Sequence, residues 1–414
     1  MGFVDPLTAI IVSFCFLGLM LYKRVNLGIT LNSTALLLAL LSINWQTIPT
    51  IIYETSVDLR TISVVLATFG VMLMGQLYKE TRAINDLSES LSRIIKSSKI
   101  VSSVLPAVIG FLPVAGGALM SAPLVDTEAE RLGLKPEKKA YVNLWFRHTI
   151  FPVYPISQVL IVTAALTGIA IPLIIMRQIP VVIVMIIVGY FIGFWKVSNP
   201  KNKENSDPKS LNSQMKRFLI AFSPILTTIV VVVCLDFSGF NLFKQGFDVL
   251  TATFIGLVVL IVISKPSLQV FEKPFKNWGI YGITSAAYGA LLLYNITKAA
   301  GISGIFENLV TSGTIDTILL LTIVPAILGF LTGSPLGGIS IGVSILDGIL
   351  TSFSPKTVAL LYMSTYLGYL IAPTHLCFVF TADYFKCSLG KVYKYLIPSF
   401  LISFTTTLLI YFLG

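Results

Sequence analysis

The sequence predicts an all-α integral membrane protein made of two inverted repeats, each with five transmembrane helices and one re-entrant hairpin. Three observations predict this fold. The chain is strongly apolar, with 55% hydrophobic and only 12% charged residues. Its lysines and arginines are concentrated in a few loops, and its two halves share similar segments. A lipid bilayer is therefore the expected environment of most of the chain.

Ten predominantly apolar segments, each with at most one charged residue, are long enough to cross a hydrocarbon core about 30 Å thick. The first has an acidic residue, Asp5, before it and Lys23 after it, which is the reverse of a signal peptide. We therefore expect it to remain as a span. The ten predicted spans are residues 6–22, 27–45, 61–78, 140–166, 172–195, 218–235, 249–264, 279–297, 357–382 and 395–413.

Two further apolar segments, residues 101–125 and 317–346, are interrupted by prolines and glycines. Basic residues flank the first segment on both sides, whereas few flank the second. Because cytoplasmic loops collect lysine and arginine, the first segment should enter and leave on the cytoplasmic face and the second on the outer face. Each is predicted to be a re-entrant hairpin whose tip is packed in protein or faces a water-filled cavity. This arrangement predicts a multi-pass protein of the cell (plasma) membrane with both termini outside.

The two hairpin segments also match each other in sequence. Residues 105–112 (LPAVIGFL) correspond to residues 324–331 (VPAILGFL), and Asp126 corresponds to Asp347. Since five spans and a hairpin make an odd number of crossings, the second copy must be inverted. The predicted parts are repeat 1 at residues 1–195, a basic cytoplasmic linker at 196–217 and repeat 2 at 218–414.

An amphipathic helix is predicted between the third span and the hairpin of each repeat. Apolar residues recur there at helical spacing, over residues 84–95 in the first repeat and 302–310 in the second. We expect both helices to lie in the membrane interface.

Four irregular elements should meet to form a solute site, as in secondary transporters with inverted repeats. They are the two hairpin tips and the proline breaks at residues 151–155 and 372–375. Glycine allows close approach of a ligand and proline interrupts helical hydrogen bonds, so helix ends become available to a solute. Kinked or tightly packed helices are the structural alternative. The predicted substrate-binding residues are Val114, Ala115, Gly116, Gly117, Arg147, His148, Thr149, Tyr154, Thr332, Gly333, Ser334, Gly337, Gly338, Thr374 and His375.

Arg147 lies inside the fourth span, about one turn before its proline break. A cation at that depth is costly unless it pairs, reaches the interface or faces water. Arginine can hold an oxyanion through two parallel hydrogen bonds, which predicts a small anionic solute. The structural alternative is an ion pair with Asp126 or Asp347, or contact with the cytoplasmic interface.

The two histidines, His148 and His375, both lie at the intramembrane breaks. Because histidine can carry a proton at physiological pH, His375, Asp126 and Asp347 are candidate proton-coupling residues. A neutral imidazole with satisfied hydrogen bonds is the structural alternative, and the coupling ion is expected to be a proton or sodium. The four cysteines show no metal-type spacing, so neither a metal centre nor another cofactor is expected.

The formal net charge of +10 is explained by basic cytoplasmic loops, and binding of nucleic acid is not expected. None of the usual intramembrane hydrolase motifs occurs, so the chain is not expected to be an enzyme. The predicted function is secondary transport of a small solute. An ion channel or a lipid translocase on the same fold is the alternative, and an intramembrane enzyme is the less favoured one.

The sequence resembles the ion transporter superfamily of secondary carriers, and in particular an uncharacterised permease family known as domain of unknown function four hundred and one. The resembling segments are residues 113–123 (PVAGGALMSAP), 145–148 (WFRH), 372–377 (APTHLC) and 384–385 (YF). Similarity to the gluconate and dicarboxylate carriers of this superfamily implies a homodimer and elevator-type movement of a transport domain. By the same similarity, the first, second, sixth and seventh spans would form the scaffold. The Ser-Asn-Thr tip motifs of dicarboxylate carriers are absent, so their sodium coupling and specificity are not implied.

Overall fold

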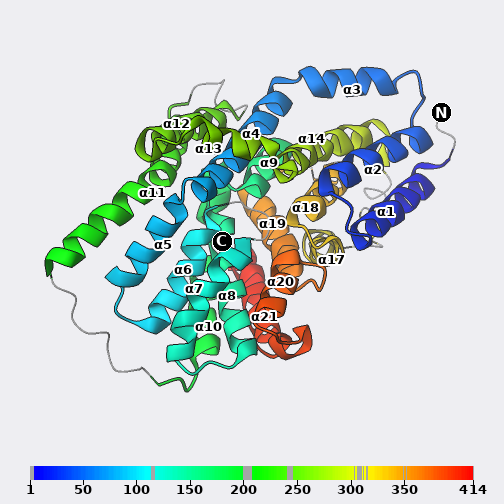
Figure 1. The fold of residues 1–414 in the computed structure, drawn as a ribbon. Helices are drawn as coiled ribbons and strands as arrows, with labels where there is room; N and C mark the ends of the chain where they lie inside the picture. Colours follow the sequence, from blue (N-terminus) through cyan, green and yellow to red (C-terminus); the bar gives the residue numbers. More distant parts are fainter. Residues whose placement is uncertain are drawn as a thin grey trace.

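The computed structural model describes residues 4–112, 117–198, 208–239, 246–302, 304, 310, 312–313, 316–347, 349–350 and 352–413. All regular elements within these residues are helices (Figure 1). Six helical segments of the described chain are long and apolar enough to cross a membrane, and shorter apolar helices accompany them. The protein is therefore a multi-pass, all-α membrane protein.

The helices of the first half follow the predicted order with one addition. The helix α3 was not expected, and Pro49 stands in its first turn, where proline favours the start of a helix. The amphipathic helix expected at residues 84–95 is α5, which buries Ile84, Leu87 and Leu91. The bounds are α1 Pro6–Tyr22, α2 Leu27–Ser42, α3 Ile48–Val57, α4 Leu59–Glu80, α5 Ala83–Ile94, α6 Ser98–Gly110, α7 Gly117–Arg131, α8 Pro136–Thr149, η1 Phe151–Val153, α9 Gln158–Thr167 and α10 Ile171–Phe194.

The helices of the second half include one that is longer than predicted. The sixth span was expected at residues 218–235, but α11 begins within the predicted linker, at Pro208. The second expected amphipathic helix, residues 302–310, lies largely outside the described residues. The bounds are α11 Pro208–Phe237, α12 Phe247–Ser264, α13 Leu268–Glu272, η3 Lys273–Lys276, α14 Trp278–Ala299, α16 Thr317–Leu321, α17 Ile323–Thr332, α18 Pro335–Leu346, α19 Pro355–Leu370, α20 Leu376–Tyr384 and α21 Leu389–Leu413.

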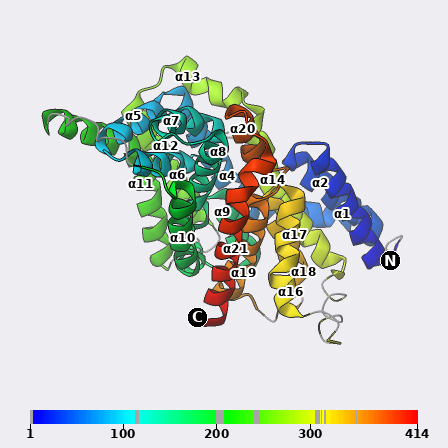
Figure 2. The same ribbon diagram turned by 90° about the horizontal axis from the view of Figure 1, so that it is seen from below.

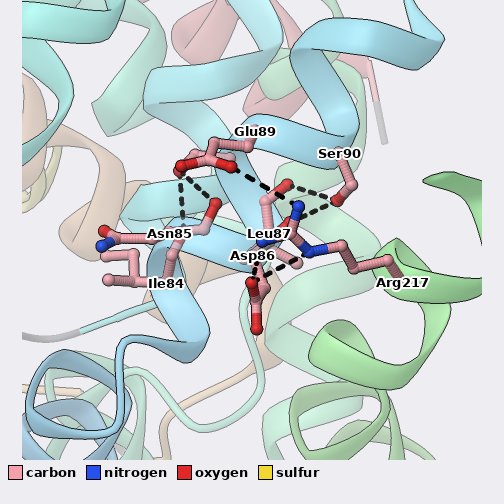
Figure 3. Close-up of polar contacts among 8 residues, drawn as sticks. Ile84, Asn85, Asp86, Leu87, Glu89, Ser90 and Arg217 are labelled. Atoms are coloured by element: carbon pink, nitrogen blue, oxygen red, sulfur yellow. Dashed lines mark hydrogen bonds and ion pairs between the residues drawn. The ribbon is translucent and has the colours of Figure 1, made fainter.

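An ion pair holds the start of α11 against α5 (Figure 3). Arg217 donates from Nε to the Asp86 carboxylate at 2.9 Å, and its Nη1 lies 3.5 Å from the Glu89 carboxylate. The polar part of α11 therefore contacts the exposed face of the amphipathic helix.

Both predicted helix breaks are confirmed. The helix α8 ends at Thr149, and α9 begins only at Gln158. In the second half, α19 ends at Leu370 and α20 begins at Leu376. The helices flanking each predicted hairpin tip also contact each other, α6 with α7 and α17 with α18. Their re-entrant position in a membrane stays a prediction.

The hairpin helices and the broken spans lie in the middle of the molecule. Figures 1 and 2 show α1 and α2 on one side of this centre and α11 and α12 on the opposite side. Helix contacts occur in matched sets: α2 with α14 and α12 with α4, α8 with α21 and α19 with α10, and α7 with α20 and α18 with α9. In the predicted repeat, α2, α4, α7, α8, α9 and α10 correspond to α12, α14, α18, α19, α20 and α21. Replacing each helix by its counterpart converts the first contact of each set into the second. This pattern supports the predicted internal repeat.

The contact between α2 and α14 is close because glycines line it. A Cβ atom on Gly28 would overlap the backbone carbonyl of Gly282. The Asn32 side chain donates from Nδ2 to the Ser285 carbonyl at 2.9 Å across the same interface. A helix of the first half is thus firmly joined to a helix of the second half.

Candidate functional site

Arg147 is a buried cation in the last turn of α8, with 2% of its surface exposed. Its side chain reaches the first hairpin segment, where Nη2 donates to the Leu112 carbonyl at 3.4 Å. Gly117, the first residue of α7, makes room for it, since a Cβ atom there would overlap the guanidinium. The guanidinium carbon also lies 6.0 Å from the ring centroid of Phe151, within cation–π range. The first break and the first hairpin segment therefore meet at this arginine.

The described residues leave the guanidinium of Arg147 only partly satisfied. Among them, its Nε and Nη1 atoms have no hydrogen-bond partner, and no carboxylate lies within ion-pair distance. The two carboxylates expected as structural partners have lysine partners: Asp126 lies 2.5 Å from Lys139, and Asp347 lies 3.7 Å from Lys298. A buried charge with free donors is unfavourable, and an anion beside it would supply the missing partner.

The start of α7 adds a second positive group at the same point. A helix N-terminus presents unpaired N–H donors and a partial positive charge. Because Gly117 opens α7 and contacts the guanidinium, both groups favour an anion there. The predicted site residues Val114, Ala115 and Gly116 lie outside the described residues.

The two histidines meet at the hydroxyl group of Tyr369. Their ring centroids are 4.7 Å apart, and the hydroxyl lies 2.6 Å from His375 Nε2 and 3.3 Å from His148 Nε2. The Nδ1 atoms face backbone carbonyls, at 2.7 Å for Leu144 and 3.5 Å for Leu370. If each Nδ1 carries the ring hydrogen, both Nε2 lone pairs point to one hydroxyl, which has a single hydrogen to donate. This arrangement leaves capacity for one further proton or cation.

The second hairpin segment meets the second break. Gly333 joins α17 to α18 with a φ of +58°, in the left-handed region that favours glycine, and a Cβ atom there would crowd Thr374. The Thr332 hydroxyl donates to the Leu328 carbonyl at 2.7 Å. Ser334 caps α18, because its hydroxyl accepts a hydrogen bond from the Gly337 amide at 3.4 Å.

The remaining predicted site residues have local roles in packing. Thr149 donates to the Phe146 carbonyl at 2.8 Å. The buried ring of Tyr154 packs edge-on against Phe111, with centroids 4.9 Å apart. Gly338 lies against α19, since a Cβ atom there would approach the side chain of Thr365.

The candidate proton-coupling carboxylates lie in a different environment from the histidines. Asp126 is paired with Lys139, whereas Asp347 accepts a hydrogen bond of 2.9 Å from the Tyr294 hydroxyl. Within the described residues, neither carboxylate is hydrogen-bonded to His148 or to Tyr369. Of the three candidates, only His375 joins the cluster at the breaks.

Sequence reasoning missed a cavity of about 620 Å³. It lies where α3, α4, α9 and α14 end or begin, and it contains acidic and basic side chains together. Charged residues are expected at the ends of any membrane helix, so their presence at the ends of these spans did not indicate a cavity. Its charged and amide side chains are Glu54, Asp58, Arg60, Asn295 and Lys298.

The fold and the cluster around Arg147 and the two histidines define a class. It is a multi-pass membrane protein with two broken helices beside a buried arginine. The chain belongs to the family described as "Protein of unknown function (DUF401)", whose sequence profile matches residues 7–413. This confirms the resemblance to the uncharacterised permease family found in the sequence. A comparison with curated proteins gives no significant match.

The fold is similar to one solved by crystallography. The Alcanivorax borkumensis YdaH transporter, described as having an unusual topology, aligns with a TM-score of 0.59 and 12% sequence identity. The alignment covers 87% of this chain and 86% of that chain. At this level of identity the likeness concerns the fold alone.

Proposed function

We propose that the protein is a secondary active transporter of a small anionic solute. One observation carries this proposal: the buried Arg147 guanidinium faces the start of α7 and has unused donors and no carboxylate partner among the described residues. The similarity in fold to a protein described as a transporter supports the same conclusion.

In this proposal, the negative group of the solute binds between Arg147 and the amides at the start of α7. The planar guanidinium offers parallel donors that match a carboxylate or another oxyanion. Gly117 keeps the approach open, because any side chain there would occupy the place of the guanidinium. The residues of the second tip and break, from Thr332 to Gly338 and from Thr374 to His375, would contact the rest of the solute.

We also propose that transport proceeds by an elevator-type movement in a homodimer. The transport domain would contain α6–α9 and α17–α20, with α1, α2, α11 and α12 as the scaffold. The position of the latter helices on the two sides of the molecule supports this division (Figure 2). The matched helix contacts support two inverted repeats, at residues 1–195 and 218–414.

Proton coupling would use the cluster of His148, Tyr369 and His375. Its two Nε2 atoms share one hydroxyl hydrogen, so a proton taken up there would complete the hydrogen bonds. The ion pairs of Asp126 and Asp347 make these carboxylates weaker candidates for the same role.

The test of anion binding uses the purified full-length protein in detergent. Thermal unfolding is measured with a panel of organic and inorganic anions, and the expected result is a rise in Tm for one class of anion. Arg147→Lys should reduce the shift and Arg147→Ala should abolish it, because lysine supplies charge without the fork. Arg177→Ala is the matched control, since Arg177 also lies in a long apolar helix but is exposed. A wild-type shift in folded Arg147→Ala protein would refute the site.

Transport itself is tested in proteoliposomes with the anion that binds. Saturable uptake with counterflow is expected of a carrier. An ohmic current would identify a channel instead, and exposure of lipid head groups on the outer leaflet would identify a lipid translocase. Either of these two results would overturn the proposed mechanism.

A further inference from the structure

A cysteine extends the histidine cluster at the two breaks. Cys377, in the first turn of α20, lies beside His148 and His375, and one ligand atom from each of the three residues lies within 4.8 Å of the other two. The cysteine is a free thiol. Both histidines are buried and Cys377 is partly buried. We propose that these three side chains form a binding site for a soft monovalent metal ion of the copper(I) class.

The orientation of the imidazoles supports this site. In histidines that bind metal ions, one ring nitrogen usually donates to a carbonyl while the other holds the metal. His148 Nδ1 lies 2.7 Å from the Leu144 carbonyl, and His375 Nδ1 faces the Leu370 carbonyl, so both Nε2 atoms are left to the Tyr369 hydroxyl or to a metal ion. The Tyr369 hydroxyl lies between these Nε2 atoms and offers an additional oxygen.

Ligand chemistry and charge both select a soft monovalent ion. Thiolate and imidazole ligands suit copper(I). On binding, the thiol of Cys377 loses its proton to solvent and a metal–sulfur bond forms, so a monovalent ion and the thiolate together are neutral. A divalent ion such as zinc(II) would leave a net positive charge beside the buried guanidinium of Arg147, which also faces Cys377. Burial of that uncompensated charge is unfavourable.

This site shares His148 and His375 with the cluster proposed for proton coupling, but its ligand is a metal ion rather than an anion. The sequence did not predict it, because the three ligands come from two broken helices that lie far apart in the chain and lack the short spacing of metal motifs.

The test is a titration of the purified full-length protein with copper(I) under anaerobic, reducing conditions, in competition with a chromophoric copper(I) chelator. We expect stoichiometric binding that is lost in Cys377→Ser and in His375→Gln. Cys387→Ser is the matched control and should bind as the wild type does, because Cys387 is a partly buried free cysteine outside the cluster. X-ray absorption of the copper-loaded wild-type protein should detect sulfur and nitrogen ligands.

Three results would overturn the proposal: absence of stoichiometric binding, retention of the site in Cys377→Ser, or tighter binding of zinc(II) than of copper(I). If a variant fails to fold, the sulfur signal of the wild-type protein still decides the matter, since its absence excludes Cys377. None of these measurements uses an anion, so failure here is separate from failure of the transport proposal.

Discussion

The hydroxyl group of Tyr366 donates a hydrogen bond of 2.7 Å to the backbone carbonyl of His148. In an uninterrupted helix this carbonyl would accept from the residue four positions later, but that residue is Pro152, which has no N–H. A side chain of α19 thus replaces the helical bond that the break in α8 removes. The two broken helices are joined at the point where the chain would otherwise leave a buried acceptor unpaired.

The first prediction concerns this bond. Tyr366→Phe removes the donor and leaves the buried carbonyl of His148 without its partner, which should lower the free energy of unfolding by about 1–3 kcal/mol. Thermal unfolding of the purified protein measures the effect. Tyr22→Phe is the control, because the Tyr22 side chain is exposed on α1. Equal Tm values for the two variants would contradict the proposed role of the bond.

The second prediction concerns the space beside Arg147. Gly117→Ala places a methyl group where the guanidinium now lies, so anion affinity should fall even though no charge is changed. Gly18→Ala is the matched control: nothing lies near its Cβ position on α1, and alanine in a helix is more stable than glycine by about 0.5–1 kcal/mol. Anion titrations of both variants are compared. Unchanged affinity in Gly117→Ala would show that the guanidinium position is not critical.

The third prediction concerns the ion pair between Arg217 and Asp86 (Figure 3). Their side chains are 41% and 46% exposed, so water and salt screen the attraction. A double-mutant cycle with Arg217→Ala and Asp86→Ala should give a coupling energy below about 1 kcal/mol that falls as salt is added. A large, salt-independent coupling energy would indicate that α5 and α11 depend on this pair for their packing.

The fourth prediction concerns membrane sidedness. In a background without the native cysteines, Ser388→Cys should react with an impermeant reagent only from the cytoplasm, and Ser312→Cys only from outside. Permeabilised cells, in which both positions should react, provide the control. Reaction of both positions from one face of intact membranes would exclude the inverted arrangement of the two halves.

The sequence was sufficient to locate the two helix breaks, because Pro152 and Pro373 cannot donate a helical hydrogen bond and so interrupt a helix wherever they occur inside it. It also located the amphipathic helix α5, since burial of Ile84 and Leu87 follows from their spacing. These features depend on residues close together in the chain. Over such short distances, helical geometry determines on which face of the helix each residue lies.

The partners across the site could not be predicted in the same way. Tyr366 and Cys377 reach His148 only through tertiary packing, and the sequence contains no local signal for contacts over such a separation. The offset of 221 residues that pairs Asp126 with Asp347 also pairs His148 with Tyr369, and this pairing is a partial indication that the two positions matter. The helix α3 was missed because it is short and its apolar run contains Pro49 and Glu54.

The matched contacts of α2 with α14 and of α4 with α12 have a consequence for synthesis. When the first half has left the ribosome, α2 and α4 are already in the membrane, but the helices that will cover them do not yet exist. The surface of α2 around Gly28 packs against Gly282, which is synthesised later. Until then, lipid or a membrane chaperone must cover this surface. The contacts of α2 with α14 therefore form only after α14 has been inserted.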